Sequence, residues 1–307
     1  RWRGWMPSSW RFPPAEFAMT LSILLLGGGW LYWTGWIAGR RIALLAGAGA
    51  LGGALVLVVV QGGIAPVAFP ILALFAGLVV SLKWVRWPVW RAVGWMFYVL
   101  VVLALGFRLL PGFAPVPVFE ASGAGNLPVV EFFPEKLILL GLAPPLILTP
   151  APPPLGWFGR DRPGLTFALI LVTTVMVLVS LALALGFARP GWASESLSIL
   201  AYQLAGNLVF TCVLEESFFR GIVQTALIRG FADWGWSPAA PLGIIAASLL
   251  FGAVHVGGGG AFMLLATVAG LGYGAAHYLT GRIQDAVAVH FAVNAVHQLF
   301  LSAPAVR

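Results

Sequence analysis

Long apolar runs separated by short polar linkers make up most of the chain. These runs cover residues 16–38, 42–61, 64–82, 88–110, 164–187, 197–228, 239–256, 261–279 and 285–303. A helix needs about 20 apolar residues to cross a bilayer. None of the runs alternates polar and apolar residues as a barrel strand does, so we expect helices. The pattern predicts an all-α fold, a polytopic transmembrane helical bundle with about eight or nine membrane spans.

One shorter run, residues 137–149, is broken by Pro144 and Pro145. It fits either a kinked short span or a re-entrant segment, and the sequence leaves both open. The basic residues of the linkers are arranged so that most fall on one side, which we expect to be cytoplasmic. The acidic, Pro- and Gly-rich loop at residues 111–136 would then lie outside. Glycines 27–29 and 47–53 predict close packing of the first two helices.

Composition supports a membrane location. The 307 residues are 60% hydrophobic and only 9% charged, whereas soluble domains carry about 25% charged residues. We therefore expect an integral, multi-pass protein in contact with membrane lipids, in a bacterial cytoplasmic membrane. The net charge of +7 does not indicate nucleic-acid binding, because the basic residues are scattered in short linkers. A single cysteine, Cys212, excludes an intrachain disulfide and a multi-cysteine metal site.

A polar, proline-rich linker divides the chain. Pro150–Pro154 and Arg160–Pro163 interrupt the apolar pattern. We expect an N-terminal transmembrane region over residues 1–154, beginning with an interfacial arm at 1–15. The C-terminal core then covers residues 155–307. The extra N-terminal helices could bind a membrane-protein partner.

Two adjacent carboxylates, Glu215 and Glu216, lie inside the apolar run 197–228. A charge at mid-bilayer costs roughly 2.5–3.5 kcal/mol on insertion scales, so these residues need an explanation. Glu216 and Arg220 are four residues apart and share a helix face, which predicts an ion pair. Glu215 is rotated away from that face and is free for chemistry.

Other polar residues in the last apolar runs complete the candidate site. His255 ends the run 239–256, whereas His290 falls near the start of the final run. If the run 261–279 between them spans fully, the two imidazoles would lie at different depths. His290 and Asn294 share a face of the final run. A desolvated glutamate can act as general base toward water, and imidazole and amide groups can stabilise an oxyanion. Alternatively, Glu215, His255 and His290 could be three ligands of a catalytic zinc ion with one open position.

These residues form three ordered motifs: Glu215-Glu216-x-x-x-Arg220, Phe251-x-x-x-His255 and His290-x-x-x-Asn294. The set resembles the CPBP intramembrane endopeptidases, also called the ABI family, which include the CAAX proteases and bacteriocin-processing enzymes. The stretch Gly270–Arg282 and the stretch Leu155–Gly159 are also similar to that family. The resemblance covers roughly residues 155–303.

The resemblance implies peptide-bond hydrolysis in a membrane-associated protein or peptide. Glu215 would activate water, Glu216 would support it with Arg220, and His255 would help place the water. His290 and Asn294 would form the oxyanion side. The family has been described both as glutamic and as metalloproteases; we favour the version without a metal, and zinc stays the alternative.

The same residues also allow non-catalytic interpretations. The two glutamates could form a structural polar cluster or a proton path in a transporter, and His290 with Asn294 could be an interhelical hydrogen-bonded pair. The main alternative is a non-catalytic membrane scaffold or partner-binding subunit that retains the protease fold. We expect catalysis if the polar residues converge around a solvent-accessible cavity. The motifs do not name the substrate or require that it be prenylated.

Overall fold

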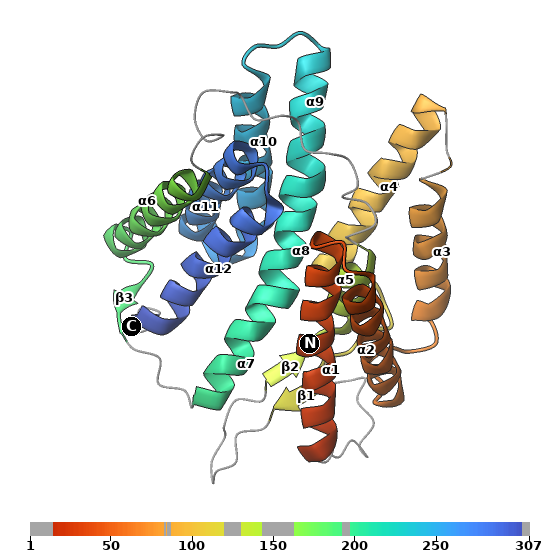
Figure 1. Cartoon of the computed structure of the whole chain (residues 1–307). Coiled ribbons are helices and arrows are strands. Elements are labelled where there is room, and N and C mark those ends of the chain that lie inside the picture. The colour runs from red at the N-terminus through yellow and green to blue at the C-terminus, as the bar shows by residue number, and fades with distance from the viewer. Residues whose placement is uncertain are drawn as a thin grey trace. The chain divides into compact units, whose positions relative to one another are not determined.

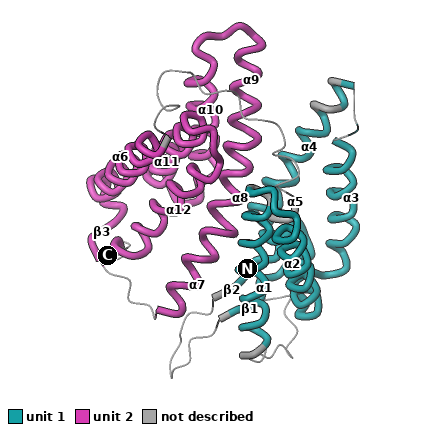
Figure 2. Tube along the Cα trace, viewed as in Figure 1, with its two compact units in different colours: residues 1–142 teal, residues 143–307 magenta. Residues whose placement is uncertain are grey.

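The computed structural model describes residues 15–82, 84, 87–119, 130–142, 163–191 and 197–302. The chain forms two compact units, residues 1–142 and 143–307, which are described separately (Figure 2). The expected boundary at residues 154 and 155, the motif-like stretch 155–159 and the expected interfacial arm up to residue 14 lie outside the described residues.

The first unit is built mainly from helices, shown in Figure 1. Their bounds are α1 Ala15–Ile37, α2 Arg41–Val60, α3 Ala68–Ser81, α4 Pro88–Gly106 and α5 Pro134–Leu142. A short antiparallel pair, β1 Val116–Phe119 and β2 Val130–Phe132, precedes α5. The strands lie in the expected loop 111–136, and the sequence pattern did not indicate them. Residues 143–149 of the proline-broken run lie outside the described residues.

Close packing of α1 on α2 confirms the role expected for part of the glycine clusters. A Cβ atom on Gly47 would lie 2.2 Å from the Tyr32 nitrogen, and one on Gly28 would lie 2.8 Å from the Ala50 Cβ. Only glycine permits such an approach of two helix backbones. Gly27 and Gly49, by contrast, have nothing within 4 Å of the added atom. Packing therefore requires glycine at positions 28 and 47, but not at positions 27 and 49.

The second unit carries the predicted site residues. Its helices are α6 Pro163–Ala184, α7 Leu197–Asn207, η3 Leu208–Cys212, α8 Val213–Glu216, η4 Ser217–Gln224, α9 Thr225–Asp233, α10 Ala239–Val254, η5 Val256–Gly258, α11 Gly259–Thr280 and α12 Ile283–Phe300. A short antiparallel pair, β3 Arg189–Pro190 and β4 Leu301–Ser302, joins the segment after α6 to the end of α12.

The elements from α7 to α9 form one continuous helix over Leu197–Asp233 (Figure 1). Two stretches of it, η3 and η4, are π-helical and flank the four-residue α8 that carries the glutamates. In a π-helix the hydrogen bonds run between residues five apart, and such segments occur often at functional sites. Near the end of η4, the Thr225 hydroxyl also donates to the Arg220 carbonyl, five residues earlier, at 2.9 Å.

Small residues let the helices around this long helix pack closely. A Cβ on Gly243 would lie 2.4 Å from an Ile228 side-chain carbon, and one on Gly252 would lie 1.9 Å from the Thr267 hydroxyl oxygen. These approaches hold α10 against α9 and α11. On the far side of α11, a Cβ on Gly272 would clash with Thr174 of α6. Contacts that glycine alone allows therefore fix α6, α9, α10 and α11 relative to one another.

The helices agree with an integral membrane protein. Five described helices are long and apolar enough to span a bilayer: Phe17–Gly35, Arg41–Val60, Gly164–Ala184, Leu197–Asp233 and Val256–Thr280. Three further apolar segments are shorter: Ala68–Ser81, Val93–Gly106 within α4, and Ala239–Val254. The all-α bundle is confirmed, but the expected eight or nine spans are not. The runs 64–82 and 239–256 form helices of fewer than 18 residues, because turns occupy their ends.

Candidate active site

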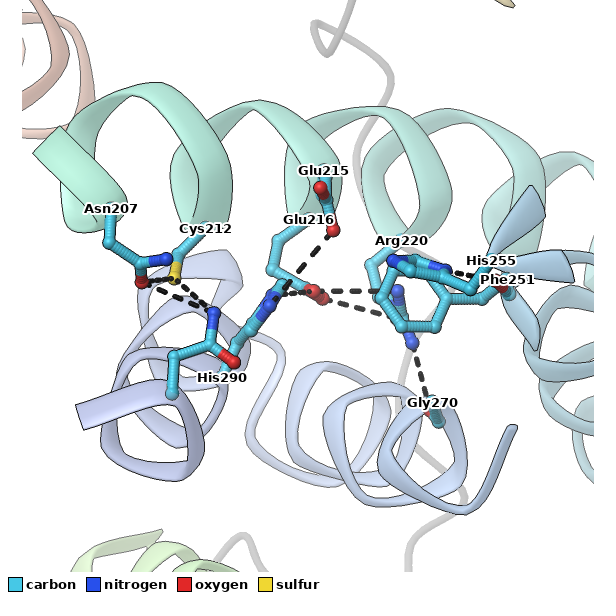
Figure 3. Close-up of polar contacts among 10 residues, drawn as sticks. Asn207, Cys212, Glu215, Glu216, Arg220, Phe251, His255, Gly270 and His290 are labelled. Atoms are coloured by element: carbon cyan, nitrogen blue, oxygen red, sulfur yellow. Dashed lines mark hydrogen bonds and ion pairs between the residues drawn. The ribbon is translucent and has the colours of Figure 1, made fainter. Parts of the chain in front are cut away.

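Glu216 is the centre of the polar cluster. Its carboxylate lies 3.1 Å from Arg220 Nε and 3.4 Å from Arg220 Nη1, so the pair predicted from the four-residue spacing is present. Both side chains are fully buried. The guanidinium is held from its other end, since Arg220 Nη2 donates to the Gly270 carbonyl at 3.0 Å (Figure 3). Arg220 therefore ties the helix that carries the glutamates to α11.

Gly270 lies beside the Arg220 guanidinium, where a larger residue would crowd its neighbours. A Cβ at this position would lie 3.0 Å from the Ser248 Cβ and 3.2 Å from Arg220 Nη2. The guanidinium also lies over the ring of Phe251, 4.7 Å from its centroid. The cation is thus enclosed by a carboxylate, a carbonyl and an aromatic face, which compensate for its removal from water.

His290 joins the two glutamates. Its Nδ1 donates to Glu216 Oε1 at 2.7 Å, and its Nε2 lies 4.0 Å from Glu215 Oε2. An ionised carboxylate only accepts hydrogen bonds, so Nδ1 carries the hydrogen and the Nε2 lone pair faces Glu215. Figure 3 shows the imidazole reaching both carboxylates. The distance of 4.0 Å is long for a direct hydrogen bond, but one water can contact both groups across it.

The imidazole ring is also held by aromatic side chains. Tyr273 stacks on His290 with a centroid distance of 4.5 Å and an interplanar angle of 14°. Phe251 meets the imidazole edge-on, at 6.0 Å and 90°. His290 and Tyr273 are both buried. The hydrogen bond to Glu216 and these two rings together restrict the imidazole to one orientation.

Glu215 has different surroundings. Its side chain is 31% exposed, whereas that of Glu216 is fully buried. Among the residues that the structure describes, the imidazole of His290 is its one ionic neighbour within 4.0 Å. Water therefore has access to Glu215 but not to Glu216. The two adjacent carboxylates differ as their sequence spacing predicted, because one points along the Arg220 face and the other points away from it.

Asn294 and His255 do not join this cluster directly. Asn294 Nδ2 donates to Asn207 Oδ1 at 3.2 Å and lies 3.8 Å from Cys212 Sγ. His255 Nδ1 lies 2.6 Å from the Phe251 carbonyl oxygen, within the last turn of α10. The Phe251 ring is next to both imidazoles, 4.6 Å from that of His255 and 6.0 Å from that of His290. The structure thus gathers Glu215, Glu216, Arg220 and His290, with the other two residues beside them.

A cavity of about 510 Å³ brings these residues to a common surface. His255, His290 and Asn294 line it, although the apolar runs had placed the two imidazoles at different depths. His290 lies near the middle of α12, which begins at Ile283. Glu215 is not among the lining residues. It reaches the cavity wall through His290.

The zinc arrangement requires Glu215, His255 and His290 to converge. Within the described part of the chain, no group of three or more His, Cys, Asp or Glu side chains is placed to hold a metal ion. The Nδ1 atoms of His255 and His290 are engaged by oxygen atoms, so only Nε2 of each ring could bind a metal. As they lie, the three side chains do not converge as a three-ligand zinc site requires.

The sequence patterns missed several polar residues of the second unit. Asn207 accepts hydrogen bonds from Asn294 and from the Cys212 thiol, the latter at 3.2 Å. Gln224 is buried and donates to the Gly274 carbonyl at 3.1 Å. His297 was assigned no role but lines the cavity. Asn207 and Gln224 lie on the same apolar helix as Glu216. A side-chain amide inside an apolar run was therefore the sequence signal that could have found them.

Comparison with known families supports the assignment. Residues 196–296 match the family model described as Type II CAAX prenyl endopeptidase Rce1-like. The chain contains an Rce1-like domain. All six predicted site residues fall within the match, and the resemblance to the CPBP family is confirmed there, over a shorter range than the motifs indicated. Comparison with curated proteins and with solved structures found no match. The Rce1-like domain points to a protease.

Proposed function

We propose that the Rce1-like domain is an intramembrane endopeptidase that hydrolyses a peptide bond with a water activated by Glu215. The observation that carries the proposal is the position of His290. Its imidazole lies on a cavity wall between an exposed glutamate at 4.0 Å and a buried one at 2.7 Å. A glutamate paired with an oriented imidazole is a common general-base arrangement.

Glu216 and Arg220 act as the anchor of the site. The Glu216 carboxylate fixes the imidazole tautomer, and the Arg220 guanidinium fixes the carboxylate. Water held between Glu215 and His290 Nε2 is then oriented by two acceptors, and Glu215 takes its proton as the oxygen attacks the carbonyl carbon. When the carbon–nitrogen bond breaks, Glu215 returns that proton to the leaving amine.

The oxyanion of the intermediate needs hydrogen-bond donors on the cavity side. Asn294 lines the cavity, and one of its Nδ2 hydrogens is directed only at the distant Cys212 sulfur. A bound substrate oxygen can replace the sulfur as the partner of that hydrogen, because the contact with sulfur is long and weak. His290 can donate through Nε2 only in the form that carries a hydrogen on both ring nitrogens. His255, farther along the same wall, is suited to contact the substrate or a second water.

The site lies near the middle of its helices. Glu216 is close to the centre of the helix Leu197–Asp233, and Gly270 is close to the centre of α11. Substrates of such a site are membrane-associated proteins or peptides that enter from the bilayer or its surface. The family description names CAAX prenyl endopeptidases, so a farnesylated peptide ending in Cys-aliphatic-aliphatic-Met is the first substrate to test.

The test uses the full chain purified in detergent and reconstituted in liposomes. Wild-type protein, Glu215→Gln and Asp233→Asn are compared on the farnesylated peptide and on the same peptide without the lipid. Asp233 is the matched control, because it is an exposed carboxylate at the end of the same helix. Loss of a general base lowers kcat by about 100-fold or more. If Glu215→Gln cleaves as fast as wild type, or if wild type cleaves neither peptide, the proposal is wrong.

A further inference from the structure

Three polar contacts connect the long helix Leu197–Asp233 to α12. Gln298 Nε2 donates to Gln203 Oε1, Asn294 Nδ2 donates to Asn207 Oδ1 at 3.2 Å, and His290 Nδ1 donates to Glu216 at 2.7 Å. Residue numbers rise along one helix as they fall along the other, so the two helices are antiparallel here. We call the two amide pairs, Gln203–Gln298 and Asn207–Asn294, the amide ladder. It extends from the proposed catalytic pair toward the C-terminal end of α12.

The amide ladder has hydrogen-bonding capacity that the protein does not use. A side-chain amide offers two N–H donors and an oxygen with two lone pairs. In the described part of the chain, the Asn294 and Gln298 oxygens and the Asn207 nitrogen have no protein partner. Asn207, Asn294 and Gln298 all line the cavity. One hydrogen bond from each amide would be enough to join the two helices. The unused N–H and C=O groups of these amides are available to a ligand.

Another part of the cavity lining is apolar. It comes from α6 and α11, through Val175, Leu178, Val179, Ala182, Leu265, Ala266 and Ala269. The same cavity therefore offers uncharged donors and acceptors from the amide ladder and aliphatic side chains from α6 and α11. An extended polypeptide with apolar side chains matches both parts of the lining, because its main chain offers N–H and C=O groups on one side. Water alone would not require the aliphatic part.

The length of the polar part of the lining sets the size of the ligand. His290 and Gln298 are eight residues apart on α12, which corresponds to about 12 Å at 1.5 Å per residue. An extended chain advances about 3.3 Å per residue, so three or four residues fit along this part. The cavity volume of about 510 Å³ also lies within the range of roughly 300–1,000 Å³ typical of ligand pockets.

We propose that the amide ladder is a main-chain binding subsite for the substrate. It holds three or four extended residues next to the cleaved bond, with their backbone on α12 and their apolar side chains against α6. The subsite rests on the proposed endopeptidase function. It adds recognition of the substrate backbone, to which Gln298 and Asn207 contribute from the cavity lining and Gln203 by positioning Gln298, without taking part in the chemical step.

The double variant Gln203→Leu/Gln298→Leu removes one contact of the ladder. Replacing both partners avoids leaving a buried amide unpaired. The matched control is Gln284→Leu, which lies on the same helix but does not line the cavity. On the farnesylated peptide and its unprenylated counterpart, we expect the double variant to raise KM about tenfold, equivalent to about 1.4 kcal/mol. Its kcat should stay within about twofold of wild type, and the control should change neither value.

A second measurement separates substrate recognition from a structural role. Peptides are N-methylated at one main-chain amide at a time, over four residues on each side of the cleaved bond. We expect methylation within the bound stretch to raise KM for wild type but not for the double variant, because the contact is already absent there. An unchanged KM, a loss confined to kcat, or equal effects of methylation on both proteins would overturn the subsite. If wild type and Glu215→Gln are equally inactive, the endopeptidase function fails and the subsite fails with it.

Discussion

The ion pair of Glu216 and Arg220 gives the sharpest test of how the second unit is held together. In Arg220→Met the aliphatic stem remains, but the Glu216 carboxylate keeps only the hydrogen bond from His290. Both charges are fully buried. Removing one partner of a buried pair costs about 3–5 kcal/mol, because the remaining charge is left uncompensated. The hydrogen bond from Arg220 to the Gly270 carbonyl is also lost.

The expected change in melting temperature follows from the size of the unit. For domains of about 150–250 residues, 1 kcal/mol shifts the melting temperature by roughly 2–4 °C. Arg220→Met should therefore melt roughly 6–20 °C below wild type in detergent micelles, followed by circular dichroism. The matched control is Arg282→Met. Arg282 pairs with Asp285 at 3.6 Å and is 55% exposed, so its loss should cost about 1 kcal/mol or less.

A double variant tests the physical cause. Glu216→Leu/Arg220→Met removes both charges and should regain at least half of the lost stability, because no unpaired charge remains. It should nevertheless be inactive, since His290 no longer has the carboxylate that fixes its tautomer. A wild-type melting temperature for Arg220→Met would refute the argument. So would a double variant that is less stable than the single one, because the cost would then come from packing and not from charge.

Further predictions concern the rest of the site. Gly270→Ala should lower stability by about 1–3 kcal/mol and reduce activity, because the added carbon would crowd Arg220. The control Gly257→Ala, whose added carbon has nothing within 4 Å, should match wild type in the same melting and cleavage assays. Tyr273→Leu should lower kcat and reduce stability by about 0.5–1.5 kcal/mol, because the ring stacked on His290 is lost. Tyr273→Phe keeps the ring and should retain the wild-type kcat and stability. Equal effects of the two variants would contradict a stacking role. Cleavage should persist after treatment with a zinc chelator, and activity lost to the chelator and restored by added zinc would contradict a reaction without a metal.

Local patterns predicted the helical elements and their immediate side-chain neighbours. The apolar runs gave helices close to the expected ranges, because burial in a membrane requires each segment to satisfy its own backbone hydrogen bonds. The pairing of Glu216 with Arg220 followed from a spacing of four residues on one helix. The different exposure of Glu215 followed from the same geometry. Each of these features depends on residues within one or two helical turns.

Contacts between helices were decided by tertiary packing. The sequence placed His290 and Asn294 together, yet His290 binds Glu216 while Asn294 binds Asn207. It also separated the imidazoles of His255 and His290 by depth, whereas both line one cavity. These partners are far apart in sequence, 74 residues in the case of His290 and Glu216. No periodicity encodes how far two helices slide past each other.

The sequence by itself therefore determined which segments are apolar helices and which of their polar residues are candidates for the chemistry, because the cost of polar groups in lipid marks both. Tertiary structure decided the partners of those residues, the cavity and the amide ladder. The physical reason is that contacts between helices depend on close packing at small residues, such as Gly270 of α11 against Ser248 of α10 and Arg220 of the helix Leu197–Asp233. That packing is a property of several helices at once, and it sets which atoms reach one another.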